Sequence, residues 1–121
     1  MDKTILLIDD KPSIGKILKA YLEEDGNRLV YFENAPSAIE WLDQGNRPTL
    51  IITDMRMPLM SGDEFLAFLK NNPLYKSIPV VILSSAESTE ERIHAFETGV
   101  DDYIVKPFNP LELKARIKKY L

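Results

Sequence analysis

The sequence predicts an α/β domain in which a five-stranded parallel sheet carries helices on both faces. Short apolar runs alternate with segments of helical periodicity along the whole chain of 121 residues. Each apolar run is followed by one amphipathic stretch, which is typical of repeated strand–helix units. No linker, low-complexity tract or internal repeat interrupts this pattern. Residues 1–121 are therefore expected to form one domain.

The strands are expected in short runs of apolar residues. The first run, ILLI at residues 5–8, is apolar throughout, as in a strand that is buried on both faces of a parallel sheet. The predicted strands are Thr4–Asp9, Arg28–Glu33, Leu50–Asp54, Val80–Ser84 and Tyr103–Val105.

Helical spacing and start signals predict the helices between these strands. Ser61 with Glu64, and Ser88 with Glu91, have the spacing of capping boxes. The Asn-Pro pair at 109–110 is typical of an N-cap followed by proline in the first helical position. In the first helix, one apolar face is predicted to consist of Ile14, Ile17, Leu18, Tyr21 and Leu22.

Composition excludes several classes of function. Fifteen basic and nineteen acidic residues give a net charge of −4, which argues against direct binding of nucleic acid by this domain. The chain has no cysteine, so neither a disulfide framework nor a thiolate metal site is possible. No segment has the length and hydropathy of a signal peptide or a membrane span, and we expect a cytoplasmic protein without a membrane partner.

Polar side chains follow the predicted strands at their carboxyl ends, where open parallel sheets bind ligands. Asp9 and Asp10 follow the first strand, Asp54 ends the third, Ser84 ends the fourth and Lys106 follows the fifth. Carboxylates without cysteine or histidine nearby suit Mg²⁺ better than zinc. A lysine and a hydroxyl could hold phosphate oxygens beside such an ion. The acidic pair is therefore expected to bind a cation.

These residues together resemble the receiver domain of response regulators, the chemotaxis-regulator-like module of two-component signalling. An acidic pair, an aspartate, a hydroxyl residue and a Lys-Pro pair follow the first, third, fourth and fifth strands in the same order. Further matches to the family pattern are Met57-Pro58, Gly62, Gly99 and Lys106–Phe108. The resemblance covers the whole chain, and it implies a flavodoxin-like, doubly wound (βα)5 sheet in the order 2-1-3-4-5 with a cis peptide between Lys106 and Pro107.

The resemblance also implies a role for each matching residue. Only one of Ser84 and Ser85 can face Asp54, because successive strand residues point to opposite faces; the resemblance favours Ser84. The implied roles are phosphoryl acceptor for Asp54, Mg²⁺ ligands for Asp9, Asp10, Asp54 and the backbone carbonyl of Arg56, phosphate-pairing lysine for Lys106, and switch residues for Ser84 and Tyr103.

The implied function is a phosphorylation-activated switch whose phosphoryl donor is a histidine kinase or a phosphotransfer protein. The domain is then not an enzyme beyond Mg²⁺-dependent self-phosphorylation and slow autodephosphorylation. Once the acceptor carries a dianionic phosphoryl group, Ser84 would donate a hydrogen bond to it. Tyr103 would then rotate from an exposed to a buried rotamer. Arg56 and Ala86 are expected to flank the path of an attacking water, and the longer Arg56 to shield the site.

Two rival functions fit the residues less well. A Mg²⁺-dependent phosphatase with an aspartate nucleophile needs a second acidic residue two positions later, but Lys11 follows Asp9 and Arg56 follows Asp54 at that distance. A nucleotide- or flavin-binding domain should have a glycine-rich phosphate loop. The five glycines form neither of its usual patterns.

The C-terminal stretch, residues 97–121, resembles receivers that precede a winged-helix DNA-binding domain. Those receivers dimerise through the fourth helix, the fifth strand and the fifth helix, which would pair opposite charges across a two-fold axis. The chain is therefore expected to be either a stand-alone receiver or the N-terminal domain of a longer regulator. The expected pairs between subunits are Arg92 with Glu112, Asp102 with Arg116, and Asp101 with Lys119.

Overall fold

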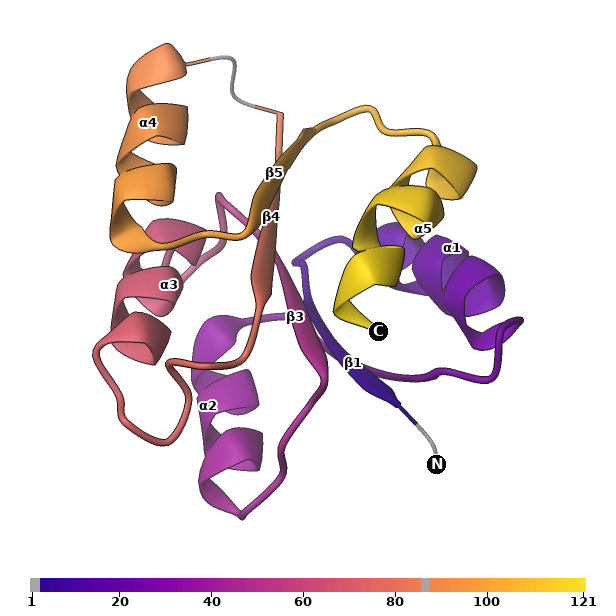
Figure 1. Cartoon of the computed structure of the whole chain (residues 1–121), viewed down its shortest axis with the longest axis horizontal. Coiled ribbons are helices and arrows are strands. Elements are labelled where there is room, and N and C mark those ends of the chain that lie inside the picture. The colour runs from indigo at the N-terminus through magenta and orange to yellow at the C-terminus, as the bar shows by residue number, and fades with distance from the viewer. Residues whose placement is uncertain (1–2, 86–87) are drawn as a thin grey trace.

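A computed structural model describes residues 3–85 and 88–121 of the chain, so Ala86 lies outside the described residues. Strands and helices alternate along it, as Figure 1 shows. The strands are β1 (Thr4–Ile8), β2 (Arg28–Phe32), β3 (Leu50–Asp54), β4 (Val80–Ser84) and β5 (Asp102–Val105). The helices are α1 (Pro12–Glu23), α2 (Ala35–Asp43), α3 (Gly62–Lys70), α4 (Thr89–Thr98) and α5 (Pro110–Ile117), and a short 3-10 turn follows at Lys118–Tyr120.

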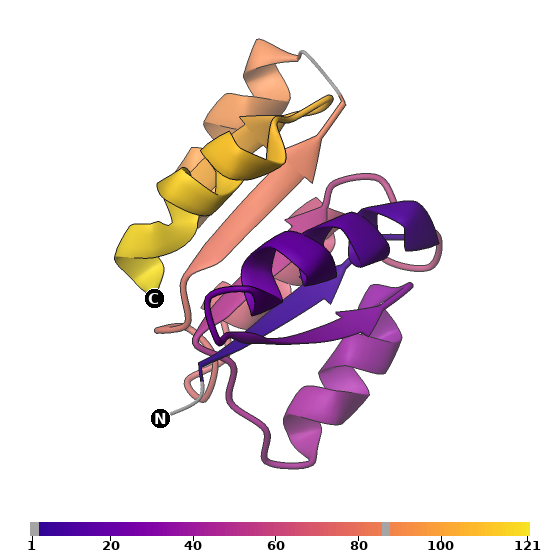
Figure 2. The same ribbon diagram turned by 90° about the vertical axis from the view of Figure 1, so that its right-hand side faces the viewer.

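The strands form one parallel sheet in the order β2-β1-β3-β4-β5, which confirms the predicted fold class and strand order. Helices α2, α3 and α4 cover one face of the sheet, and α1 and α5 cover the other (Figure 1). Figure 2 shows α1 and α5 side by side in front of the strands. The predicted strand ends differ from the structure by one residue: Asp9 and Glu33 lie beyond their strands, and β5 begins at Asp102.

Each face of the sheet contributes to a separate hydrophobic core. Successive side chains of a strand point to opposite faces. Leu6 and Ile8 of β1 therefore pack under α2 and α3, whereas Ile5 and Leu7 pack under α1 and α5. All four side chains are fully buried. This two-sided burial explains why β1 is apolar throughout instead of alternating.

Local signals set most helix starts as predicted. Ser61 and Glu64 form the complete capping box of α3, and the Asn109 side chain caps α5 ahead of Pro110. At α4 only half of the predicted capping box forms: the Ser88 hydroxyl accepts a hydrogen bond from the Glu91 backbone N–H, 3.2 Å away, whereas the Glu91 carboxylate pairs with Arg56.

The predicted apolar face of α1 is wrong at one position. Ile17 is 41% exposed, whereas Leu18 and Leu22 are fully buried. The buried side of α1 is centred on Gly15, Leu18 and Leu22, so Ile17 lies at its margin. The interior position that an apolar side chain would otherwise occupy is taken by a glycine.

A close backbone approach fixes α3 against the end of β3. The Gly62 N–H donates a hydrogen bond to the Met55 carbonyl, 2.7 Å away. A Cβ atom at Gly62 would lie 2.2 Å from the Asp54 carbonyl oxygen and 2.9 Å from the Met55 Cα, so only glycine fits. This contact holds the end of the strand that carries Asp54.

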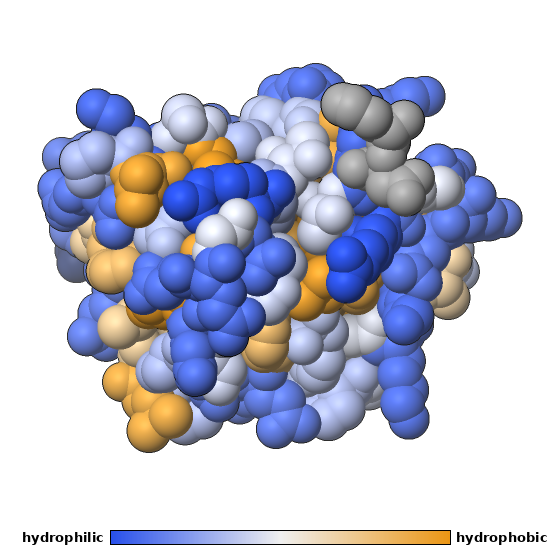
Figure 3. All heavy atoms as spheres, turned by 90° about the horizontal axis from the view of Figure 1, so that it is seen from below, coloured by the Kyte–Doolittle hydropathy of each residue, from blue (hydrophilic) through white to orange (hydrophobic). Residues whose placement is uncertain are grey.

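Seen from the amino end of the sheet, the surface of the protein is mainly hydrophilic, and its hydrophobic areas are small and separated by polar side chains (Figure 3). No helix among residues 3–85 and 88–121 is long and apolar enough to cross a membrane.

Candidate functional site

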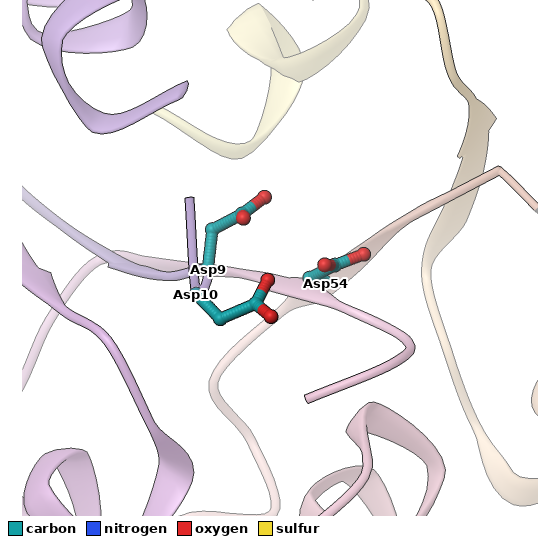
Figure 4. Close-up of side chains that lie close together, drawn as sticks. All are labelled: Asp9, Asp10 and Asp54. Carbon is teal, nitrogen blue, oxygen red and sulfur yellow. The ribbon is translucent and has the colours of Figure 1, made fainter. Parts of the chain in front are cut away.

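Three carboxylates meet at the carboxyl ends of β1 and β3. Asp9 and Asp10 come directly after β1, and Asp54 is the last residue of β3, the neighbouring strand. Their side chains lie close together (Figure 4), and one oxygen of each lies within 4.8 Å of the others. Asp9 is fully buried, Asp54 is 6% exposed and Asp10 is exposed. The structure thus brings together the three acidic residues that were predicted from the sequence to lie at one edge of the sheet.

Lys106 supplies a positive charge to this cluster. Its Nζ lies 2.9 Å from Asp9 Oδ2 and 3.3 Å from Asp54 Oδ1. The Lys106 backbone N–H donates to the Ser84 carbonyl, 2.8 Å away, which fixes the residue beside the end of β4. The peptide that follows, Lys106–Pro107, is cis, as the resemblance implied. One ammonium beside three ionised carboxylates leaves an excess of negative charge, which a divalent cation would neutralise.

The donor set fits Mg²⁺ or a related hard cation. All the side-chain donors in the cluster are carboxylate oxygens, the ligands that Mg²⁺ prefers in proteins. The exposed Asp10 leaves one side of the cluster open to water, and Mg²⁺ usually retains several waters.

Asp9 is restrained at every polar group. Its N–H donates to the Phe32 carbonyl (3.1 Å), and its Oδ1 accepts from the Lys11 N–H (2.9 Å). Its carbonyl accepts from the Tyr31 hydroxyl, 2.6 Å away. Burial raises the pKa of Tyr31, and the charges of Glu33 and then of Asp9 and Asp10 raise it further. Tyr31 was not predicted as a site residue from the sequence, because no motif marks it.

Burial raises the pKa of Asp54 above its ordinary value, and the charge of Asp9 raises it further. Lys106 and the Met55 N–H, 2.9 Å from Asp54 Oδ1, act in the opposite direction without cancelling the shift. In the metal-free protein, ionisation of Asp54 is therefore less favourable than that of an ordinary, solvated aspartate.

The two expected switch residues are both buried. Ser84 is fully buried at the end of β4, whereas Ser85 is exposed. Tyr103 is 5% exposed, and its ring lies 5.6 Å from the Arg92 guanidinium carbon. Its hydroxyl has no hydrogen-bond partner among the described residues. The structure thus shows Tyr103 in a buried position rather than in the exposed rotamer expected before activation, and its switch role stays a prediction.

Arg56 lies in the loop after β3, and its side chain turns toward α4. Its Nη2 lies 3.1 Å from Glu91 Oε1, and the side chain is 68% exposed. This ion pair links the loop that follows Asp54 to α4. The predicted roles of Arg56, as a carbonyl metal ligand and as a shield, stay predictions.

The side chains of three of the six residues expected at a dimer interface, Asp101, Asp102 and Arg116, have hydrogen-bond or ion-pair partners within the chain. Arg116 makes two hydrogen bonds to Asp102, Nε to Oδ2 at 3.1 Å and Nη2 to Oδ1 at 2.7 Å. Asp101 accepts a hydrogen bond from the Val80 N–H and lies 3.7 Å from Lys70 Nζ. A dimer through this face would therefore have to exchange the Asp102–Arg116 pair or add to it.

Replacing Asp54 by asparagine should stabilise the metal-free protein at neutral pH. A raised pKa means that ionised Asp54 weakens folding, and that this loss develops as the pH rises through the folded-state pKa. In chelator, the melting temperature of Asp54→Asn minus that of the wild type should be small at about pH 3.5 and larger at about pH 7.5. Glu40→Gln, which neutralises an exposed carboxylate on α2, should show no such trend. A wild type more stable than Asp54→Asn at neutral pH would contradict this electrostatic account.

Known proteins share the fold and the sequence pattern of this chain. The family pattern of the response regulator receiver domain matches residues 5–118. The phosphate regulon transcriptional regulatory protein PhoB of Escherichia coli is 40% identical over 118 residues, which cover 98% of this chain and 51% of PhoB. The chain thus spans about half the length of the curated relatives it matches.

Solved structures agree with the sequence relatives. The chemotaxis response regulator CheY4 of Vibrio cholerae superposes with a TM-score of 0.90 at 28% identity, over 100% of both chains. The Mn²⁺-bound form of response regulator Rcp1 superposes with a TM-score of 0.84 at 29% identity, over 97% of this chain and 90% of Rcp1. The fold, the strand-end cluster and these matches agree, and the chain belongs to the response regulator receiver domain family.

Proposed function

We propose that Asp54 accepts a phosphoryl group from a histidine kinase or a phosphotransfer protein in a Mg²⁺-dependent reaction. As a receiver domain, the protein is a phosphorylation-activated switch of two-component signalling. The observation that carries the assignment to Asp54 is the cluster itself: a nearly buried carboxylate ends β3, two more carboxylates lie beside it, and the Lys106 ammonium is 3.3 Å away. We place this reaction in the cytoplasm, which is consistent with the family.

The residues present can support the transfer of a phosphoryl group. An Asp54 oxygen would attack the phosphorus of the donor, so that an O–P bond forms while the P–N bond of a phosphohistidine breaks. Lys106, already beside Asp54 Oδ1, would pair with an oxygen of the transferred group. Asp9, Asp10 and the Arg56 carbonyl would hold Mg²⁺, which supplies compensation of the negative charge on the transferring group. The Mn²⁺-bound Rcp1 supports a divalent cation in this fold.

The phosphatase alternative is not supported. Lys11 and Arg56 occupy the positions where such an enzyme needs a second acidic residue, and the comparisons give receiver domains instead. We propose that the chemistry of this domain is limited to its own phosphorylation and to slow loss of the phosphoryl group. Phosphorylation would then change the surface formed by α4, β5 and α5, and Ser84 and Tyr103 would transmit the change from Asp54 to that surface.

The relatives suggest the output that this surface controls. PhoB is a transcriptional regulatory protein about twice the length of this chain. We propose that the domain acts as the receiver of a transcriptional regulator, in which DNA is contacted by a separate domain. The net charge of −4 agrees with a receiver that does not itself bind nucleic acid.

A two-fold dimer through α4, β5 and α5 is the form of output that we propose. On α4, Ile93 is 52% exposed and Phe96 is 48% exposed, so an apolar area is available beside the charged residues. Because Arg116 already bonds to Asp102 within one subunit, exchanging this pair between subunits yields little net free energy. The apolar contacts of α4 would supply most of the affinity, and the charges would select the register.

Phosphorylation is tested directly with acetyl phosphate or phosphoramidate and Mg²⁺. Intact-mass spectrometry should show one added phosphoryl group on the wild type and none on Asp54→Asn, because the asparagine amide is not a nucleophile at neutral pH. Chelation of Mg²⁺ should abolish the reaction of the wild type. Equal incorporation into both proteins would show that the acceptor is another residue.

Dimerisation is tested by sedimentation with and without beryllium fluoride and Mg²⁺, which mimic the phosphoryl group. The wild type should form a dimer, or a tighter one, with the mimic, and Arg116→Glu should weaken it by about fivefold or more. Asp102→Arg combined with Arg116→Asp should restore it, whereas Lys19→Glu, on the exposed side of α1, should have no effect. A wild type that stays monomeric at high concentration would exclude the dimer. Unchanged dimerisation of Arg116→Glu would place it on another face.

A further inference from the structure

We propose that Tyr31 is a positioning residue for the metal-binding aspartates. Its hydroxyl holds the peptide between Asp9 and Asp10 in the orientation that directs the Asp10 carboxylate toward Asp9 and Asp54. This inference rests on the proposed divalent-cation site and adds a residue to it that no motif of the chain marks.

Strand β2 holds Asp9 with two successive residues. The last register pairs of β1 with β2 are Leu7 with Tyr31 and Ile8 with Phe32. Beyond them, the Asp9 N–H still donates to the Phe32 carbonyl, 3.1 Å away, but the chain then turns away from the sheet toward α1. The Asp9 carbonyl accepts instead from the Tyr31 hydroxyl, at 2.6 Å. The side chain of Tyr31 thus extends the contact between the strands by one peptide group.

This peptide group determines where Asp10 can place its carboxylate. Asp10 is exposed, and within residues 3–85 and 88–121 no side chain bonds to its carboxylate. By contrast, the Asp9 carboxylate is held independently by the Lys11 N–H and by Lys106. Within the described residues, the direction of the Asp10 side chain is therefore fixed by the backbone alone. On its N-terminal side this is the Asp9–Asp10 peptide, which Tyr31 holds, and on its C-terminal side it is the start of α1.

Repulsion gives this restraint its importance. In the metal-free protein, three carboxylates with oxygens within 4.8 Å of one another repel, and rotation of the Asp9–Asp10 peptide would move the freest of them outward. The Tyr31 hydroxyl opposes that rotation. Without it, the cluster would relax in the absence of metal, and a cation would have to bring Asp10 back. The hydroxyl is thus expected to matter for metal affinity more than for stability.

Gly15 provides the space that the Tyr31 ring needs. A Cβ atom at Gly15 would lie 3.0 Å from one ring carbon of Tyr31, and 3.1 Å and 3.2 Å from two others. Glycine inside a helix is unfavourable relative to alanine, so its presence in α1 requires another reason. Close contact with the Tyr31 ring is such a reason. A larger residue at position 15 would push the ring, and with it the hydroxyl, without changing Tyr31 itself.

The test is calorimetric titration of Mg²⁺ into wild type, Tyr31→Phe, Gly15→Ala and the double variant. Tyr31→Phe keeps the ring and removes the hydrogen bond, so the dissociation constant should rise about fivefold while the metal-free melting temperature changes little. Gly15→Ala should weaken Mg²⁺ binding in the wild type but not in Tyr31→Phe, where no hydrogen bond is left to lose. Tyr21→Phe, which removes a hydroxyl from α1 and leaves Tyr31 intact, is the matched control.

The outcomes separate this inference from the proposed function. If the wild type does not bind Mg²⁺, the proposed metal site fails and the role of Tyr31 fails with it. If the wild type binds Mg²⁺ and Tyr31→Phe binds it equally well, the inference alone is overturned. A loss of affinity in Tyr31→Phe that is matched by a large drop in the metal-free melting temperature would show a structural role and would also overturn it.

Discussion

Electrostatic crowding at the ends of β1 and β3 is the constraint on which the rest of the site depends. A doubly wound sheet brings Asp9, Asp10 and Asp54 together, although repulsion opposes this and burial penalises the ionised form of Asp54. In the metal-free protein, Lys106 compensates part of the charge by bonding to Asp9 and approaching Asp54. A divalent cation would complete the compensation, and a phosphoryl group would then give Lys106 a new partner. The repulsion and burial that make ionised carboxylates unfavourable in the metal-free protein thus favour the binding of a cation at the site.

The fold could be predicted from the sequence because its signals are local. Two-sided burial makes β1 and β3 apolar along most of their length, and the Ser61 and Asn109 caps mark helix starts. The errors occurred where tertiary packing decides. Whether the residue after β1 still belongs to the strand depends on the register with β2, and the exposure of Ile17 depends on how closely α1 approaches the sheet at Gly15.

The candidate site could be predicted as far as its residues end strands. Asp9, Asp10, Asp54 and Lys106 were selected because parallel strands bring their carboxyl ends to one edge. Tyr31 was missed, because its hydrogen bond to Asp9 depends on a side chain that reaches past the end of β1. An unexplained glycine inside α1 was the available signal. The Asp102–Arg116 pair within one chain was missed too, since sequence reasoning assigned both charges to a partner subunit.

The central claim is that the acidic cluster exists to bind a divalent cation, and titration of Mg²⁺ into wild type and Asp10→Asn tests it most directly. Asp10 is the exposed member, so its removal relieves repulsion and takes away a ligand without opening the core. The account predicts saturable binding to the wild type and about tenfold or more weaker binding to Asp10→Asn. It also predicts that the metal-free melting temperature of the variant is no lower than that of the wild type. Equal Mg²⁺ affinity together with a clear loss of metal-free stability would contradict the account and assign Asp10 to capping α1.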